Sequence, residues 1–238
     1  MNITKPACVA LVVITVSIVL ATARLSAPQD GRPEETKSVK LPQPKLKGTM
    51  SLEEAIKKRR CVRSYKDKAL TLEQLSQLLW SADGITGESN YQRAAPSAGG
   101  LHPLDFYVVA GSGSVKGLKE GVWHYEPKKH EISLIKAGDW RGELEKASLG
   151  QKQVGTAELV IVVTVEYERT TRKYGNRGNR YALMDAGFAC ENTFLQVQSL
   201  GLAACVVGAF HDDKVRNVLN LPEKHEPLIL LTIGYSAE

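Results

Sequence analysis

LVIVVTV, residues 159–165, is an uncharged run in which every residue after Leu159 is β-branched. This composition favours a strand that is buried on both faces of a sheet. A long helix is predicted to follow over about residues 180–200, with Gly201 as the residue that ends it. Its apolar stripe consists of Leu183, Ala186, Cys190, Phe194 and Val197. We therefore expect this strand in the core sheet and this helix as the central helix.

The other predicted elements extend outward from this pair. Capping boxes at Ser51 and Thr71 predict helices that begin after these residues. Further helices are predicted over 140–149 and after Asp212 or Asp213, and strands over 106–110, 122–125, 131–135, 203–207 and 228–233. Because helices and strands alternate irregularly, we expect an α+β layered fold with a mixed central sheet.

Length and composition indicate an ordinary globular protein. The 238 residues suit one substantial domain, and 43% hydrophobic with 24% charged residues argues against wholesale disorder and against a multi-spanning membrane protein. The formal net charge of +5 is spread along the chain. No nucleic-acid partner is therefore expected.

The N-terminal segment predicts export from the cytoplasm. Residues 7–23 are uncharged and mostly apolar, follow Lys5, and close with Ala21-Thr22-Ala23. This anatomy is typical of a signal peptide, with an uncleaved membrane anchor as the alternative. Residues 24–48 are rich in Pro, Lys, Glu and Ser and are expected to form a flexible linker before one domain at 49–238. The location expected is periplasmic or extracytoplasmic.

Cysteine and histidine spacing gives no sign of a metal site or a disulfide framework. The four cysteines are Cys8, Cys61, Cys190 and Cys205, and they form no C-x-x-C pair. None of the five histidines has the H-x-x-x-H spacing of a helical metal site. No metal is therefore expected, and the cysteines after the leader are expected to be small buried or half-buried residues.

Three short segments could each approach a ligand. Arg59-Arg60-Cys61-Val62-Arg63 could bind a phosphate, although cations at a helix C-terminus often only face water. Residues 95–100 form a small-residue loop, and residues 206–210 leave a strand at a glycine; both could bring backbone close to a ring or be plain turns. The glycine-rich stretch at 111–117 is interpreted as a turn because no helix follows it.

The order and spacing of these segments resemble the nitroreductase family of flavoproteins, and more closely its SagB-type branch, which includes azoline dehydrogenases. The resemblance covers about residues 50–235. The matching segments are RRCVRSY at 59–65, PSAGGLHPL at 96–104, KYGNRGNRYALMDAG at 173–187 and GLAACVVGAF at 201–210. The resemblance implies a homodimer with two shared active sites.

The resemblance also implies FMN as the cofactor and assigns roles to particular residues. Cofactor binding falls on Arg59, Arg60, Cys61, Arg63, Pro96, Ser97, Ala98, Gly99, Val207, Gly208 and Ala209, with the proline-serine loop supplied by the partner subunit. Cys61 replaces the usual serine, and a thiol is a poorer hydrogen-bond donor. A proton-transfer role falls on Lys173 and Tyr174, for which a solvated loop is the alternative.

The function predicted is therefore two-electron transfer between FMN and a small-molecule or peptide-derived substrate. NADH or NADPH is a candidate donor, and the sequence does not choose the direction of the reaction. The alternative is an exported flavin-binding protein that keeps the fold without turnover. Contact with a membrane is expected only through the N-terminal segment, if that segment is not cleaved.

Overall fold

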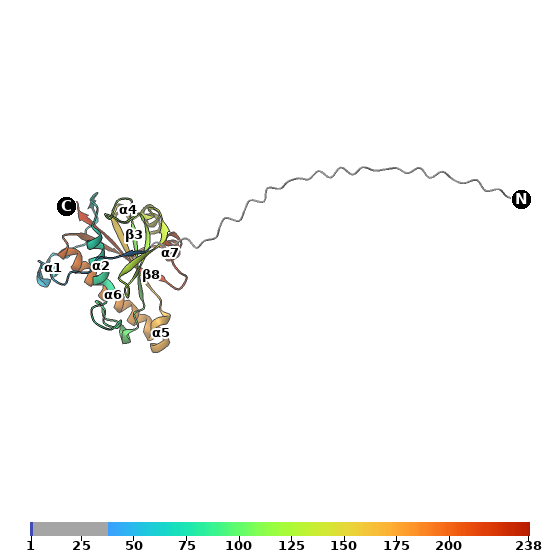
Figure 1. Cartoon of the computed structure of the whole chain (residues 1–238), viewed down its shortest axis with the longest axis horizontal. Coiled ribbons are helices and arrows are strands. Elements are labelled where there is room, and N and C mark those ends of the chain that lie inside the picture. The colour runs from blue at the N-terminus through green and yellow to red at the C-terminus, as the bar shows by residue number, and fades with distance from the viewer. Residues whose placement is uncertain (2–37) are drawn as a thin grey trace. The chain divides into compact units, whose positions relative to one another are not determined.

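The computed structural model describes residue 1 and residues 38–238, and from residue 38 onward they belong to one compact unit (Figure 1). The helices are α1 (Leu52–Lys58), α2 (Leu72–Asp83), α3 (Arg141–Ala147), α4 (Lys152–Thr156), α5 (Glu168–Tyr174), α6 (Arg177–Ser199) and α7 (Asp212–Leu219). The strands are β1 (Ser38–Lys40), β2 (Tyr65–Lys66), β3 (Leu104–Ala110), β4 (Gly121–Glu126), β5 (Glu131–Ala137), β6 (Leu159–Val165), β7 (Ala203–Val207) and β8 (Glu226–Ser236). The predicted leader at 7–23 and the first part of the predicted linker lie outside the described residues. Within the described part of the chain, no helix is long and apolar enough to cross a bilayer.

One eight-stranded sheet organises the domain, in the order β1-β5-β4-β3-β6-β8-β2, with β7 also paired to β8. Strand β6 is buried at every position and lies between β3 and β8, as the LVIVVTV run predicts. Pairings between named strands are antiparallel, and a short turn joins β4 to β5. Parallel pairing among the described residues is limited to single bridges, Cys61 with Ala204 and Leu70 with Val115. The sheet is therefore less mixed than expected.

Alternate side chains of β6 point to opposite faces of the sheet and enter two hydrophobic cores. Ile161 and Val163 pack with α2 and α6, whereas Val160 and Val162 pack with α3, α4 and α7. The domain thus has helices on both faces of the sheet. The α+β class and the layered arrangement predicted from the sequence are confirmed.

The predicted linker does not extend to residue 48. Strand β1 pairs with β5 at the sheet edge, and Leu41 is only 2% exposed. Lys45 N donates to Gln77 Oε1 at 2.8 Å, and Gln77 Nε2 donates back to Lys45 O at 3.1 Å. Because these contacts satisfy backbone groups of the segment, residues 38–48 form part of the domain.

Several other elements differ from their predictions. The helix expected at 140–149 is α3 alone, and a separate α4 follows it. Helix α6 begins at Arg177, three residues before its predicted start, and α5 precedes it where no helix was predicted. Lys173 and Tyr174 therefore end a short helix and do not lie in a loop.

Candidate functional site

A buried carboxylate on α6 holds the proline-serine loop. Ser97 Oγ donates to Asp185 Oδ2 at 2.6 Å, and Ala98 N donates to the same oxygen at 3.3 Å. His102 N donates to Ser97 Oγ at 2.9 Å, which closes the loop on itself. Asp185 is 4% exposed, and burial raises the pKa of its carboxyl group. The loop is thus fixed to α6 by its two central residues.

Lys173 and Tyr174 meet this loop at Gly99. A Cβ atom placed on Gly99 would lie 2.6 Å from Tyr174 Oη and 2.9 Å from Lys173 Nζ. Gly99 has φ of +62°, which also favours glycine at this position. The Tyr174 ring packs edge-on against Tyr181 with centroids 5.1 Å apart. The structure therefore brings together two predicted segments that are about 75 residues apart in the sequence.

The arginine segment lies beside the start of β7. Cys61 bridges Ala204, and Val62 N donates to Ala204 O at 2.9 Å. Arg59 Cζ lies 5.7 Å from the centroid of the Phe194 ring on α6. Cys61 is exposed, in contrast to the expectation for the cysteines, whereas Cys190 and Cys205 are buried.

The three arginines of this segment do not have equivalent positions. Arg60 Nη1 donates to Lys57 O at 3.1 Å and to Arg59 O at 3.3 Å, so its guanidinium covers carbonyl groups at the end of α1. None of the ion pairs within residues 38–238 involves Arg59 or Arg63. These two side chains therefore keep donors for an anion.

The exit of β7 presents open backbone. Val207 is buried, whereas Gly208 and Ala209 are exposed. A Cβ atom on Gly208 would have no neighbour within 4 Å, and Ala209 O accepts a hydrogen bond from Gln151 Nε2 at 2.8 Å. A planar ligand could approach the chain here without a side chain in the way. With guanidinium donors and bare backbone near one strand, these residues fit a phosphate-bearing flavin.

Helix α6 separates the two groups of predicted site residues within one chain. Asp185, which holds the loop, and Phe194, which holds Arg59, are nine residues apart. Nine residues span about 14 Å and about two and a half turns, so the two contacts lie on opposite sides of the helix. The loop and the arginine segment are therefore not brought together along α6 in one protomer.

An exposed apolar stripe of α6 borders the loop. Leu183, Met184 and Phe188 are 52%, 44% and 50% exposed. Leu183 was predicted to belong to the buried stripe, but it lies at the edge of that stripe and faces outward. The loop and α6 enclose a hollow of about 290 Å³, lined by Pro96, Ser97, Ala98, Tyr181, Met184, Asp185 and Phe188.

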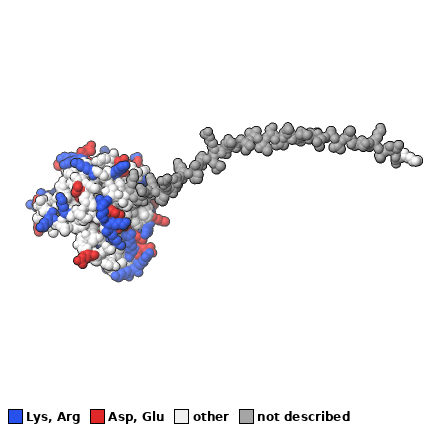
Figure 2. Space-filling view, viewed as in Figure 1, with Lys and Arg blue, Asp and Glu red and all other residues white. Residues whose placement is uncertain are grey.

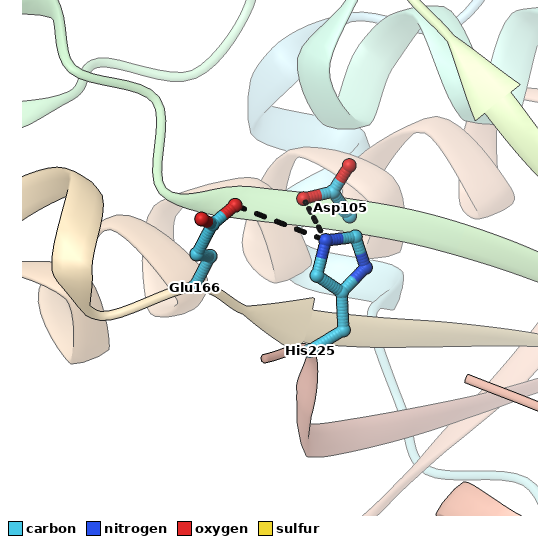
Figure 3. Close-up of side chains that lie close together, drawn as sticks. All are labelled: Asp105, Glu166 and His225. Atoms are coloured by element: carbon cyan, nitrogen blue, oxygen red, sulfur yellow. Dashed lines mark ion pairs between the residues drawn. The ribbon is translucent and has the colours of Figure 1, made fainter. Parts of the chain in front are cut away.

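A second cluster, at Asp105, Glu166 and His225, was not predicted. His225 Nε2 lies 3.5 Å from Asp105 Oδ2 and 3.9 Å from Glu166 Oε2 (Figure 3). These residue types can bind a metal ion. However, Arg169 Nη2 lies 2.7 Å from both carboxylates, and Lys224 Nζ lies 3.0 Å from Glu166 Oε1. The two carboxylates are already balanced by two cations.

Electrostatics in this cluster follows from burial and those cations. Burial alone would raise the pKa of Asp105, but the hydrogen bond from His124 and the charge of Arg169 lower it. Burial would also raise the pKa of Glu166, but the hydrogen bonds and charges of Lys224 and Arg169 outweigh this effect and lower it. Both groups are therefore ionised at neutral pH. The sequence signal was a polar residue near the start of β3, one directly after β6 and one directly before β8, which the antiparallel pairing brings to one edge of the sheet.

Comparison with known proteins gives one consistent result. A sequence profile of the nitroreductase family matches residues 56–235. A provisionally assigned nitroreductase of Methanocaldococcus jannaschii is 40% identical over 189 residues, which cover 79% of this chain and 93% of that protein. The crystal structure of a provisionally assigned nitroreductase from Ralstonia eutropha is 30% identical, with a TM-score of 0.73 over 84% of this chain and 90% of that chain.

A third relative has a more specific name. McbC of Escherichia coli, a microcin B17-processing protein, is 25% identical over 169 residues. The match covers 69% of this chain and 62% of McbC. The nitroreductase-like fold expected from the four sequence segments is confirmed by the Ralstonia structure.

Proposed function

The chain belongs to the nitroreductase family, and we propose that it is an FMN-dependent oxidoreductase of the SagB-type branch. Membership of this family makes the chain an oxidoreductase. The observation that carries the finer proposal is the convergence of Lys173 Nζ and Tyr174 Oη on Gly99 of the proline-serine loop. The alternative, a flavin-binding protein without turnover, gives no reason for an amine and a phenol to meet there.

The arginine segment would hold the phosphate of FMN. Arg59 and Arg63 offer guanidinium groups suited to bidentate bonds with phosphate, and Arg63 is exposed. The backbone at Gly208 would accommodate the flat ring. Arg60 would have fewer donors to offer, because its Nη1 is bonded to carbonyl groups at the end of α1. When bound, FMN supplies the two-electron chemistry.

A homodimer with shared sites is part of the proposal. The exposed apolar residues Leu183, Met184 and Phe188 give α6 a face that burial against a second copy would stabilise. The loop is bonded to Asp185 and Arg59 of the arginine segment packs on Phe194, so the two segments lie on opposite sides of α6. A two-fold interface along α6 would let the loop of one protomer face the arginine segment of its partner.

Lys173 and Tyr174 would move a proton as the substrate is oxidised or reduced. Both side chains carry protons on atoms that converge on one point, and both end α5 at the edge of the loop. A positioned acid or base contributes about 10²- to 10⁴-fold to rate. The similarity to McbC, a microcin-processing protein, supports a peptide-derived substrate as well as a small molecule.

The first test is the identity of the bound cofactor. The purified chain should release FMN on denaturation, and NADH or NADPH should be tried anaerobically as donors to the bound flavin. A chain that takes up no FMN even after incubation with excess cofactor would refute the proposal.

The second test separates the two half-reactions. Lys173→Ala and Tyr174→Phe should retain FMN and the fold but slow the substrate half-reaction by about 10²- to 10⁴-fold. Arg172→Ala is the matched control, because Arg172 is paired with Glu168 at 2.9 Å on the same helix. Stopped-flow rates that are unchanged in both variants, or variants that lose FMN, would assign the pair a structural role.

A further inference from the structure

Lys173 and Tyr174 have few contacts of their own that would fix their place. Lys173 takes part in none of the ion pairs found between residues 38 and 238. Its Nζ lies 5.3 Å from the centroid of the Tyr174 ring, and that ring packs against Tyr181 of α6. The place of the pair beside Gly99 therefore follows the position of α5, which ends with these two residues.

Helix α5 is too short and too polar to hold that position by itself. It has seven residues, of which Thr170 is the buried one, and an isolated helix of this length is marginal in water. Three of its residues are basic and one, Glu168, is acidic. Figure 2 shows Lys and Arg grouped at the end of the molecule that carries α5 in Figure 1. Contacts with the rest of the domain must therefore hold a positively charged helix in place.

The guanidinium group of Arg169 joins α5 to the loop and to the sheet. Arg169 Nη1 donates to His102 O, just after the proline-serine loop, at 3.1 Å. Arg169 Nη2 lies 2.7 Å from Asp105 Oδ2 on β3. Arg169 Nε donates at 2.7 Å to Oε2 of Glu166, in the turn that leads from β6 to α5. Figure 3 shows these two carboxylates close together. All three nitrogens of one side chain are thus used on three different segments.

Burial makes these contacts stronger than the other ion pair of α5. The side chains of Asp105 and Glu166 are only 13% and 9% exposed, so water and salt screen their contacts with Arg169 weakly. Arg172 and Glu168 are instead 72% and 63% exposed and pair within α5 itself. A surface pair of this kind contributes little. Arg169 is therefore the ion-pairing residue of α5 that can fix the helix against the domain.

We propose that Arg169 is a positioning residue for proton transfer: it holds α5 against the loop and so keeps Lys173 and Tyr174 beside Gly99. The inference rests on the proposed function, because it names what places the proton-transferring pair. Arg169 lies one turn before Lys173 on the same face of α5, so a shift of the helix at Arg169 moves the pair as well. A displacement of about 1 Å can cost about 10²-fold in rate.

Hydrogen exchange tests the contact without turnover. Amide exchange is followed by mass spectrometry in peptides that cover α5, for the full chain with and without FMN. Arg169→Ala should raise the rate of exchange there about tenfold, the factor that corresponds to one charge-assisted hydrogen bond. Lys224→Met is the matched control, because Lys224 Nζ lies 3.0 Å from Oε1 of the same Glu166 but is not part of α5 or the loop. It should leave exchange in α5 unchanged.

Stopped-flow kinetics tests the consequence for the reaction. The reduced, FMN-loaded chain is mixed with 4-nitrobenzamide, which takes up two electrons and two protons to give the nitroso compound and water. Arg169→Ala should slow this step about 10²-fold at saturating acceptor and leave the half-saturating concentration and the FMN content unchanged. Arg169→Lys keeps the charge but cannot make the three contacts, so it should restore only part of the rate. If Arg169→Ala does not fold, Arg169→Lys provides the same comparison with a smaller loss.

A chain that lacks the pair separates positioning from a general structural effect. In the Lys173→Ala/Tyr174→Phe background, Arg169→Ala should slow the step no further, because the groups that it positions are gone. Circular dichroism shows whether each variant is folded. A further loss of about 10²-fold in this background would overturn the inference, because Arg169 would then act on the rate by another route.

The remaining outcomes separate this inference from the proposed function. Unchanged exchange in α5 or an unchanged rate for Arg169→Ala would overturn the inference. So would full recovery by Arg169→Lys or an equal loss with Lys224→Met, because a diffuse positive charge would then be enough. A chain that takes up no FMN would refute the proposed function, whereas exchange in α5 would still decide whether Arg169 holds the helix that carries the pair.

Discussion

The bond between Ser97 and Asp185 can be measured by a double-mutant cycle. Ser97 Oγ donates to the buried carboxylate at 2.6 Å, and a hydrogen bond to a charged group contributes about 1.5–3 kcal/mol. Ser97→Ala should therefore lower the free energy of unfolding by about 2 kcal/mol. Asp185→Ala also removes the longer bond from Ala98 N and should cost about 3 kcal/mol. The double variant should cost less than the sum by about 2 kcal/mol, because both single changes remove the same bond.

Urea denaturation of the four proteins gives this coupling energy. Thr193→Val is the matched control, because Thr193 Oγ1 is buried on the same helix but bonds only to Ala189 O. Thr193→Val combined with Ser97→Ala should be additive within about 0.5 kcal/mol. Additivity of Ser97→Ala and Asp185→Ala would refute the anchoring role of Asp185. The single variants should also lose substrate turnover, because Gly99 would no longer be held beside Lys173 and Tyr174.

Three other predictions concern the buried acid on α2, the cofactor and the leader. Burial raises the pKa of Asp83 to about 7, against opposing effects of Arg93. Because the folded pKa exceeds the unfolded one, the stability it contributes is complete at low pH and is lost as the pH rises through about 7. Relative to Asp83→Asn, the chain should therefore lose up to about 4 kcal/mol of unfolding free energy between about pH 4 and pH 8, and parallel curves would contradict this. Arg63→Ala should weaken FMN by about 2 kcal/mol and riboflavin far less, as measured by fluorescence titration; equal losses would remove Arg63 from the phosphate site. If residues 7–23 direct export, fractionation of the native cell should find the chain outside the cytoplasm, and a full-length soluble cytoplasmic chain would count against the leader.

The sheet and the central helix were predictable because their residues carry strong local signals. The run 159–165 has no charged residue and all but Leu159 are β-branched, and Gly201 follows α6 with a positive φ. Strand β1 and helix α5 were missed for the opposite reason. Ser38–Lys40 is three residues long, and Glu168–Tyr174 has almost no apolar residue, so tertiary contacts decide both.

The site was predictable only in part. Spacing cannot show that Lys173 and Tyr174 contact Gly99, and only the family resemblance placed both segments in one site. Asp185 was not predicted, although an acid within an otherwise small and apolar helical segment was a usable signal. The pairing of Arg169 with Asp105 and Glu166 joins a strand, a loop and a helix, which no local pattern encodes.

Helix α6 limits which insertions and deletions the site can tolerate. Between Asp185 and Phe194 it sets both the distance and the angle at which the loop and the arginine segment meet the helix. Removing one residue there would shorten the helix by about 1.5 Å and rotate one contact by about 100° relative to the other. The connecting turns at the surface can change in length without this effect. The chain should therefore accept a changed length in the turn at Pro127–Lys129 far more readily than a single deletion between residues 186 and 193.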